Sequence, residues 1–396
     1  MLEKCKTLTA EGGVSFELFP ERDLETVLVT SIDWNDKIPS CSRHSIVSEA
    51  ICQAGIKGKI TNESLLKEIR RIESEYLKNP SVRYMLVSTL SMKWSDELRP
   101  VTVLGVRFSF HARIPRQVDF SAVQWGLDVS NTTSPHPAGY TVVCGKVLAK
   151  SPEEASSLVL TALDVLRGIW NYVLNRKTIS IIHLSGGDWK PLNQIRLGPV
   201  HTVHLSNGKP ATQMWWGEQG FSKGKVADLA EKWDAMTRQV TWHLGRSKRL
   251  PYDAVGIWTR YVRAFDHADQ EASFLRLWSL LELLTVTNSE GYVETIKRTL
   301  FVFEDQELHR LILNHLRDCR NALVHRDESQ EQVEQHVFQL KRYVEALMRL
   351  HFAMAGKFNT LDEVREFLSL PADPKLLKSR KQLISHGIKF RTKRRK

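Results

Sequence analysis

The spacing of hydrophobic and polar positions changes about halfway along the chain. In the first half, short runs rich in β-branched and aromatic residues are bounded by Pro, Gly, Ser or Asn, which is typical of β-strands. The predicted strands are residues 83–92, 101–112, 140–148, 179–184 and 200–205. Helices are predicted over residues 62–78 and from Ser151, where Ser-Pro-Glu-Glu supplies a helix start. Residues 1–215 are therefore predicted to form an α+β domain.

After Gly220 the strand signal ends, and apolar residues recur at three- and four-residue steps. The predicted helices are residues 225–244, 252–265, 271–286, 306–323 and 330–354, with a further short helix from Thr360. Their connections are short, so the apolar stripes can face one another. The predicted fold is thus an α+β N-terminal domain followed by an all-α helical bundle over residues 221–370.

The positive charge of the chain is concentrated at its C-terminal end. The 396 residues include 56 Lys and Arg against 45 Asp and Glu, a net charge of +11. Residues 375–396 hold ten basic residues and no acidic one, which leaves +1 for the rest. Because the preceding Pro371-Ala-Asp-Pro374 resists helix continuation, residues 371–396 are interpreted as a basic tail.

Two interpretations of this tail stay open. It either holds nucleic-acid phosphates through an attraction that weakens with salt, or is a solvated end of the chain. The residues expected to contact nucleic acid are Lys389, Arg391, Lys393, Arg394, Arg395 and Lys396.

Composition and motifs argue against several classes of protein. With 42% hydrophobic and 26% charged residues, the chain has the balance of a soluble globular protein. No apolar run approaches the ~18 residues of a membrane-spanning helix, and the first fifteen residues show no secretory signal. The prediction is a cytoplasmic protein with no membrane partner.

The sequence shows no familiar metal or nucleotide motif. Its five cysteines are far apart and never in Cys-x-x-Cys form, so reduced thiols are expected. His201 and His204 would point to opposite faces of a strand and have no companion ligand nearby. We therefore predict no metal and no cofactor.

One short motif in the predicted bundle combines residues suited to catalysis, Arg320-Asn321-Ala-Leu-Val-His325. The spacing Arg-x4-His occurs four times in the chain and is not specific by itself. The helix is expected to pack through one stripe, made of Leu308, Ile312, His315, Leu316, Cys319 and Leu323. Asn321 and His325 lie nearly opposite this stripe, and His315 is expected to be a hydrogen-bonded core histidine.

Arg320 is expected about 140° around the helix from His325, too far for easy convergence on one helix unless the helix frays near His325. The same helix of a second copy would bring the two groups together across a two-fold axis. The predicted assembly is accordingly a homodimer through the helical bundle.

The motif resembles the Arg-x4-6-His signature of HEPN domains (higher eukaryotes and prokaryotes nucleotide-binding), in which a polar residue, often Asn, follows the arginine. The upstream segment Phe274-Leu-Arg-Leu-Trp278-Ser-Leu-Leu-Glu282 is similar to the corresponding helix of the Apea-like branch. The resemblance covers roughly residues 250–355, whereas residues 1–215 resemble no family.

Many HEPN proteins are metal-independent ribonucleases that act as dimers in toxin, abortive-infection or antiviral systems, so the resemblance implies RNA cleavage. His325 would move a proton between the ribose 2′-hydroxyl and the leaving 5′-oxygen, which leaves a 2′,3′-cyclic phosphate. Arg320 would bind the phosphate and stabilise its added negative charge, and Asn321 would orient the histidine or a phosphate oxygen.

Each of these residues also has a structural interpretation. Arg320 and His325 would satisfy carbonyl groups at a helix C-terminus, and Asn321 would cap the helix locally. Glu282 is expected to be partly buried and to pair with Arg320, a supporting role preferred over proton transfer. Trp215 and Trp216 would stack on bases or, preferably, pack between the two domains.

Three functional hypotheses follow. The first is a HEPN-type ribonuclease whose N-terminal domain senses a trigger or holds the nuclease inactive. The second is a non-catalytic module that binds RNA, nucleotides or partners, with the basic tail as its nucleic-acid contact. The third, an enzyme in the N-terminal domain, has no supporting set of carboxylates, Ser-His pair or metal ligands in the sequence.

Overall fold

The computed structural model describes residues 2–4, 6–8, 14–16, 18–120, 136–175, 193–218, 221, 223–266, 269–287, 290–325 and 333–393. Its first part is helical. The elements in order are a 3-10 helix Leu2–Lys4, β1 (Lys6–Leu8), β2 (Val14–Phe16), α1 (Leu18–Ser31), α2 (Ser40–Lys57) and α3 (Asn62–Lys78). Helix α3 is confirmed with its predicted bounds, and Thr61 caps it through Ser64.

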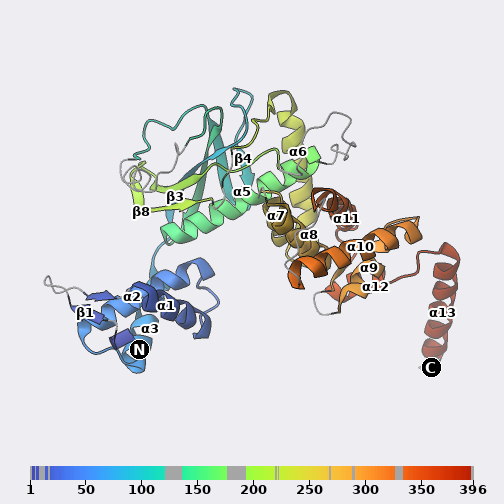
Figure 1. The fold of residues 1–396 in the computed structure, drawn as a ribbon, viewed down its shortest axis with the longest axis horizontal. Helices are drawn as coiled ribbons and strands as arrows, with labels where there is room; N and C mark the ends of the chain where they lie inside the picture. The colour runs from blue at the N-terminus through green and yellow to red at the C-terminus, as the bar shows by residue number, and fades with distance from the viewer. Residues whose placement is uncertain are drawn as a thin grey trace.

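Helices α1 and α2 were not predicted from the sequence. Helix α2 is rich in Ser and small residues, so its apolar stripe is weak in the sequence. The helix is stabilised by packing against α3, which a local pattern does not show. Helices α2 and α3, with side chains of α1 packed against them, enclose a hydrophobic core of their own, in which Ile46, Ala50 and Ile69 are almost fully buried. This core is separate from that of the rest of the chain, and Figure 1 shows the three helices as a distinct group near the N-terminus.

The middle of the chain forms a six-stranded antiparallel sheet in the order β4-β5-β6-β3-β7-β8. The strands are β3 (Val82–Leu90), β4 (Val101–Val103), β5 (Val106–His111), β6 (Thr141–Ala149), β7 (Val200–Leu205) and β8 (Pro210–Gly217). Four predicted strand regions are confirmed, one of them as the pair β4 and β5, and residues 179–184 lie outside the described residues. Strand β8 was not predicted.

Helix α5 (Pro152–Asn175) covers one face of the sheet and confirms the predicted helix start. Gly145 in β6 allows this contact, because a Cβ atom there would lie 2.4 Å from Val159 Cγ1. Among the described residues, α5 is the one helix long and apolar enough to cross a membrane, and 67% of its apolar window is buried inside the protein. This is the arrangement of a core helix and is compatible with a soluble protein.

The C-terminal part of the described chain is helical, as predicted. Its elements are α6 (Trp233–Ser247), α7 (Ala254–Ala264), α8 (Gln270–Thr285), α9 (Tyr292–Leu300), α10 (Gln306–His325), α11 (Val333–Ala353), α12 (Leu361–Leu368) and α13 (Pro374–Lys393). Helix α9 was not predicted. Helix α6 begins later than expected, because Ala227 instead makes an extended bridge with Met92.

The sheet and the helical region share one hydrophobic core, which runs from Tyr84 to Leu368. A buried ionic cluster crosses between them: Arg167 of α5, fully buried, pairs with Asp164 and with Asp266 after α7, at 2.6 and 2.8 Å. Arg263 of α7 joins Asp164 at 2.6 Å. The predicted boundary near residue 220 is therefore not a break in the core.

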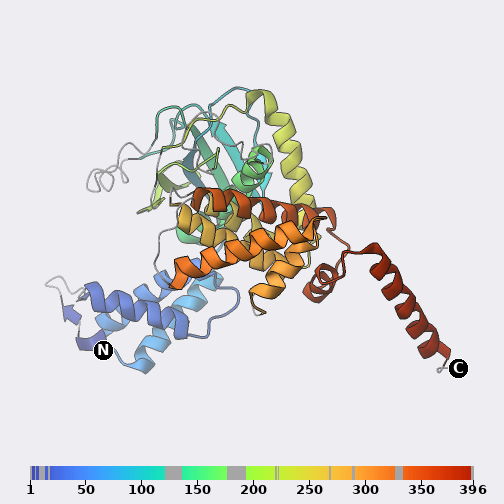
Figure 2. The same cartoon turned by 45° about the vertical axis from the view of Figure 1, so that its right-hand side comes forward.

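Helix α13 stands apart, projecting from the body in Figures 1 and 2.

Candidate functional site

Helix α10 carries the Arg-Asn-x-x-x-His motif in its last two turns. Its buried face consists of His309, Leu313, Leu316 and Cys319. The predicted stripe is wrong at Leu308, which is 50% exposed, and at His315, which is exposed rather than part of the core. The burial pattern shows that the face turned toward the core begins one residue later than the sequence pattern indicated.

Arg320 lies at the edge of this face, with its guanidinium over an aromatic ring. Its Cζ atom is 5.0 Å from the ring centre of Tyr292, the first residue of α9, and its side chain is partly exposed. Arg320 forms no ion pair with any described carboxylate. A guanidinium held by its face on a ring keeps the N–H donors along its edge available for an anion.

Glu282 does not pair with Arg320, contrary to the prediction. Its Oε1 atom instead accepts a hydrogen bond of 2.8 Å from Trp278 Nε1, one turn earlier on α8. The Trp278 ring packs edge-on against Tyr292 at 5.9 Å. The two predicted residues thus belong to one chain of contacts, from Glu282 through Trp278 and Tyr292 to Arg320. The Glu282 carboxylate is therefore hydrogen-bonded to Trp278 on its own helix and does not reach Arg320.

Asn321 is partly exposed and forms no side-chain hydrogen bond to another described residue. His325 is the last residue of α10, and its side chain lies outside the described part of the chain. The structure therefore places Arg320 and Asn321 on adjacent positions of one helix.

Two of the other three Arg-x4-His pairs lie in buried, structural surroundings. His243 is buried among aromatic rings, including those of Tyr172, Trp258 and Phe352, at centre distances of 5.5, 5.1 and 5.2 Å. Arg196 is buried and donates to the backbone oxygen of Asp266 at 2.5 Å. Environment therefore distinguishes the motif at Arg320 from these pairs, which share only its spacing.

A second group of reactive side chains lies on the same helix, and the sequence analysis did not identify it. His315 Nε2 is 3.2 Å from Nε2 of His336, on α11, and 3.5 Å from the Sγ atom of Cys319. Burial lowers the pKa of His336, and the neighbouring His315 lowers it further. Burial also raises the pKa of the Cys319 thiol. The available sequence signal was the four-residue spacing of His315 and Cys319, which places both on one helix face.

The sheet also contains a Ser-His-Glu arrangement that the sequence did not reveal. His201 Nδ1 lies 2.7 Å from Ser88 Oγ, and His201 Nε2 lies 3.1 Å from Glu218 Oε1. Burial raises the pKa of Glu218, but contacts with His201 and Arg263 outweigh it and hold that pKa at about 2. Ser88 and His201 are each 1% exposed, so this group links strands in the interior and offers no access to a substrate.

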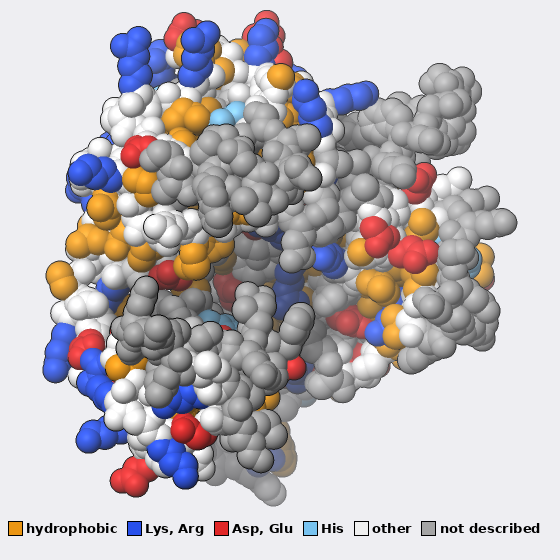
Figure 3. All heavy atoms as spheres, turned by 60° about the vertical axis from the view of Figure 1, so that its left-hand side comes forward, with side chains coloured by type: hydrophobic (Ala, Val, Ile, Leu, Met, Phe, Trp, Pro, Cys, Tyr) orange, Lys and Arg blue, Asp and Glu red, His pale blue; other side chains and the backbone are white. Residues whose placement is uncertain are grey.

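The basic tail is a helix. Lys389 and Arg391 are exposed on α13, which also carries exposed Leu383 and Ile384. Lys393 ends α13, but its side chain is not described, and Arg394, Arg395 and Lys396 lie outside the described residues. On the face of the body shown in Figure 3, Lys and Arg side chains are interspersed with Asp and Glu rather than forming one basic surface.

The tryptophan pair lies in β8, at the edge of the sheet. Trp216 packs against the main core, whereas Trp215 packs with Val200 and Phe120 on the other side. Both side chains are partly buried. Their packing role is thus within the sheet region rather than at a junction between two domains.

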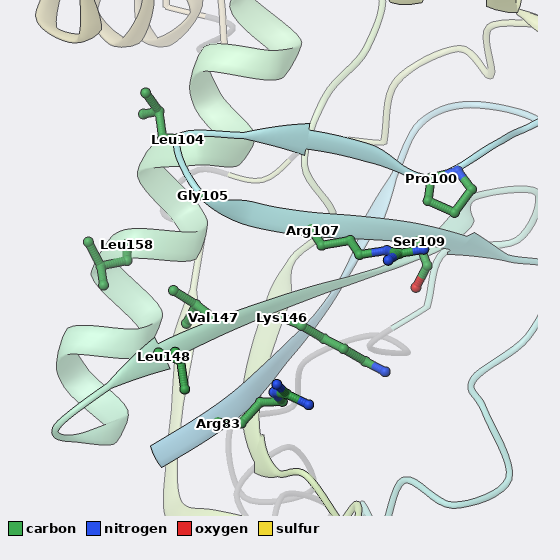
Figure 4. A pocket seen from close by; sticks show the side chains of 10 residues that line it. All are labelled: Arg83, Pro100, Leu104, Gly105, Arg107, Ser109, Lys146, Val147, Leu148 and Leu158. Carbon is green, nitrogen blue, oxygen red and sulfur yellow. The ribbon is translucent and has the colours of Figure 1, made fainter. Parts of the chain in front are cut away.

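A basic hollow of about 810 Å³ lies on the sheet, at β3, β5 and β6. Arg83, Arg107 and Lys146 line it, and Figure 4 shows these side chains extending from the three strands. Arg107 and Lys146 are directly opposite each other on neighbouring strands. No carboxylate is among the described residues that line the hollow, so it favours an anion.

In comparisons with known proteins, no protein-family model, no curated protein and no solved structure matches this chain.

Proposed function

We propose that this chain is a HEPN-type endoribonuclease that cleaves RNA by attack of the ribose 2′-hydroxyl, with Arg320, Asn321 and His325 as its active-site residues. The observation that carries the proposal is the environment of the Arg320 side chain. Its side chain is partly exposed, rests on Tyr292 and has no carboxylate partner among the described residues. The buried Arg167 is paired with carboxylates, as buried charges are, whereas the donors of Arg320 stay available for an anion.

The proposed chemistry assigns one task to each residue. His325 takes the proton from the 2′-hydroxyl and returns one to the leaving 5′-oxygen, since an imidazole exchanges protons near neutral pH. Arg320 binds the phosphate through its edge donors and stabilises the transition-state charge. Asn321, whose amide has no hydrogen-bond partner among the described residues, orients His325 or a phosphate oxygen. Glu282 has a supporting role, because it fixes Trp278, against which Tyr292 rests.

The proposal includes a homodimer formed through the helical region. Leu308 and Leu311 are 50% and 71% exposed on α10, and Val293 of α9 is 70% exposed. Exposed apolar side chains on α9 and α10 favour contact with another protein surface. A second copy contributing its own α10 would supply the facing histidine that one helix cannot easily bring to Arg320.

The remaining parts of the chain are assigned to binding and control. Helix α13 presents basic side chains to solvent and would hold RNA phosphates without regard to sequence. The N-terminal region would receive a trigger or inhibitor. The basic hollow at Arg107 and Lys146 favours a ligand that carries phosphate groups. Toxin or antiviral action in the cytoplasm is the proposed cellular role.

The alternative is a non-catalytic module that binds RNA or nucleotides. The exposure of α13 favours it, because a projecting basic helix binds nucleic acid with or without catalysis elsewhere in the chain.

Incubating the purified chain with mixed cellular RNA, without added metal, and mapping the fragment ends separates the two functions. We expect new ends that carry 2′,3′-cyclic phosphates. Intact RNA that nonetheless binds the protein would favour the non-catalytic module.

A further inference from the structure

Three potential metal ligands meet between α10 and α11. His315 and Cys319 lie one turn apart on α10, and His336 faces them from α11. His315 Nε2 is 3.2 Å from His336 Nε2 and 3.5 Å from Cys319 Sγ, and the three atoms all lie within 4.8 Å of one another. This is the one such group of three or more found among the described residues.

The two separations from His315 Nε2 fit a single metal ion. With Zn–N bonds near 2.05 Å and a Zn–S bond near 2.3 Å, tetrahedral angles place two nitrogen ligands about 3.3 Å apart and a nitrogen and a sulfur about 3.6 Å apart. Imidazole and thiolate are also the ligand types that zinc and similar ions prefer. Hydrogen bonds alone would require the one His315 nitrogen to serve both neighbours, whereas an ion accepts all three lone pairs at once.

We propose that His315, Cys319 and His336 bind a zinc-type transition-metal ion that joins α10 to α11 beside Arg320. Cys319 precedes Arg320 in the chain, so the ion fixes the part of α10 that carries the motif. A metal ion that joins His315 and Cys319 to His336 cross-links two helices and thereby stabilises the folded state. His315 is exposed, which leaves the fourth coordination position to solvent.

The helices already contact each other on this side. His309 Nδ1 lies 2.9 Å from the hydroxyl oxygen of Tyr343, which places α10 and α11 antiparallel with the ligand group nearer their connection. The ion would add a second point of attachment at that end. It has no role in the proposed proton transfer, and its binding is independent of whether the chain cleaves RNA.

Metal binding is tested directly on the full-length chain. Reduced protein is treated with a chelator, exchanged into metal-free buffer and titrated with Zn²⁺ by calorimetry. Co²⁺ is then used as a spectroscopic probe. We expect one equivalent of Zn²⁺ to bind, a higher Tm in its presence, and a thiolate-to-cobalt charge-transfer band.

Three variants and two controls make the assignment specific. Cys319→Ala should remove the charge-transfer band, and His336→Ala should weaken Zn²⁺ binding at least tenfold. His315→Ala provides a variant at an exposed position, where loss of folding is not expected, and should weaken binding in the same way. Cys41→Ala and His386→Ala are matched controls that should bind like the parent. Unchanged binding by the folded His315→Ala protein, or no saturable binding by the parent, would overturn the proposal.

Discussion

The guanidinium of Arg320 lies 5.0 Å from the ring centre of Tyr292, and this contact takes the place of the ion pair expected with Glu282. A carboxylate would have occupied the donors of the arginine, whereas an aromatic face leaves them available. Tyr292 is in turn held by Trp278, whose indole N–H is anchored on Glu282. The arginine is thus positioned by packing, and its charge is not neutralised by any described carboxylate.

Replacing Tyr292 tests this positioning. Tyr292→Leu removes the ring and should lower RNA affinity and cleavage about two- to fivefold, the range expected for a partly exposed cation–π contact of roughly 0.5–1 kcal/mol. Tyr292→Phe keeps the ring and serves as the control. Single-turnover cleavage rates and filter binding provide the measurements. Equal losses in the two variants would argue that the hydroxyl, not the ring, is the important group.

Arg320→Ala and His325→Ala should each reduce cleavage by at least about a hundredfold, because they remove charge stabilisation and proton transfer respectively. Circular dichroism and the Tm should stay near those of the parent. Arg310→Ala is a matched control, since Arg310 is an exposed arginine on the same helix with a histidine at the same spacing. A double variant as active as the parent would refute the proposed site.

Deleting residues 375–396 should weaken RNA binding while leaving the cleavage positions unchanged. Each phosphate contact contributes a slope of about −0.7 to the dependence of log K on log salt for a single strand, so the truncated protein should show a flatter dependence. Electrophoretic mobility shifts across a salt series and end mapping provide the two measurements. A full-length variant with glutamine at Lys389 and Arg391 separates the effect of charge from that of the helix.

The buried His351 predicts a loss of stability in mild acid. Burial lowers its pKa to about 4, and it accepts a hydrogen bond from the Tyr252 hydroxyl while donating one of 2.8 Å to the Leu284 carbonyl. Because the unfolded pKa is near 6.5, the unfolded chain binds more protons between pH 6.5 and 4. The stabilising contribution is complete above that window and is lost as pH falls through it.

At pH 5 this loss amounts to about 2 kcal/mol, estimated from 1.36 kcal/mol per unit of pKa shift. Thermal unfolding at pH 7 and pH 5 should show a larger fall in Tm for the parent than for His351→Gln, which has no titrating imidazole. His44→Gln, at an exposed position, should behave like the parent. If His351→Gln shows the same pH dependence as the parent, other groups are responsible.

Strong local patterns were sufficient to predict much of the fold. The runs of β-branched and aromatic residues in β3 and β6, the helix start at Ser151 and the apolar stripe of α11 are properties of neighbouring residues, so they are visible in the sequence. Helix α2 and strand β8 were missed for the opposite reason. Their apolar positions are sparse, and each is stabilised by an element distant in sequence or by an edge of the sheet.

The sequence by itself determined which residues make up the candidate site, namely Arg320, Asn321 and His325 at the end of one helix, because residue type and helical spacing are local. Only the tertiary structure decided what surrounds them. Tyr292 under Arg320, Trp278 on Glu282, and His336 opposite His315 and Cys319 come from other turns or other helices. Such contacts depend on how helices pack, and that packing is set by the shape and burial of the whole core rather than by any short run of residues.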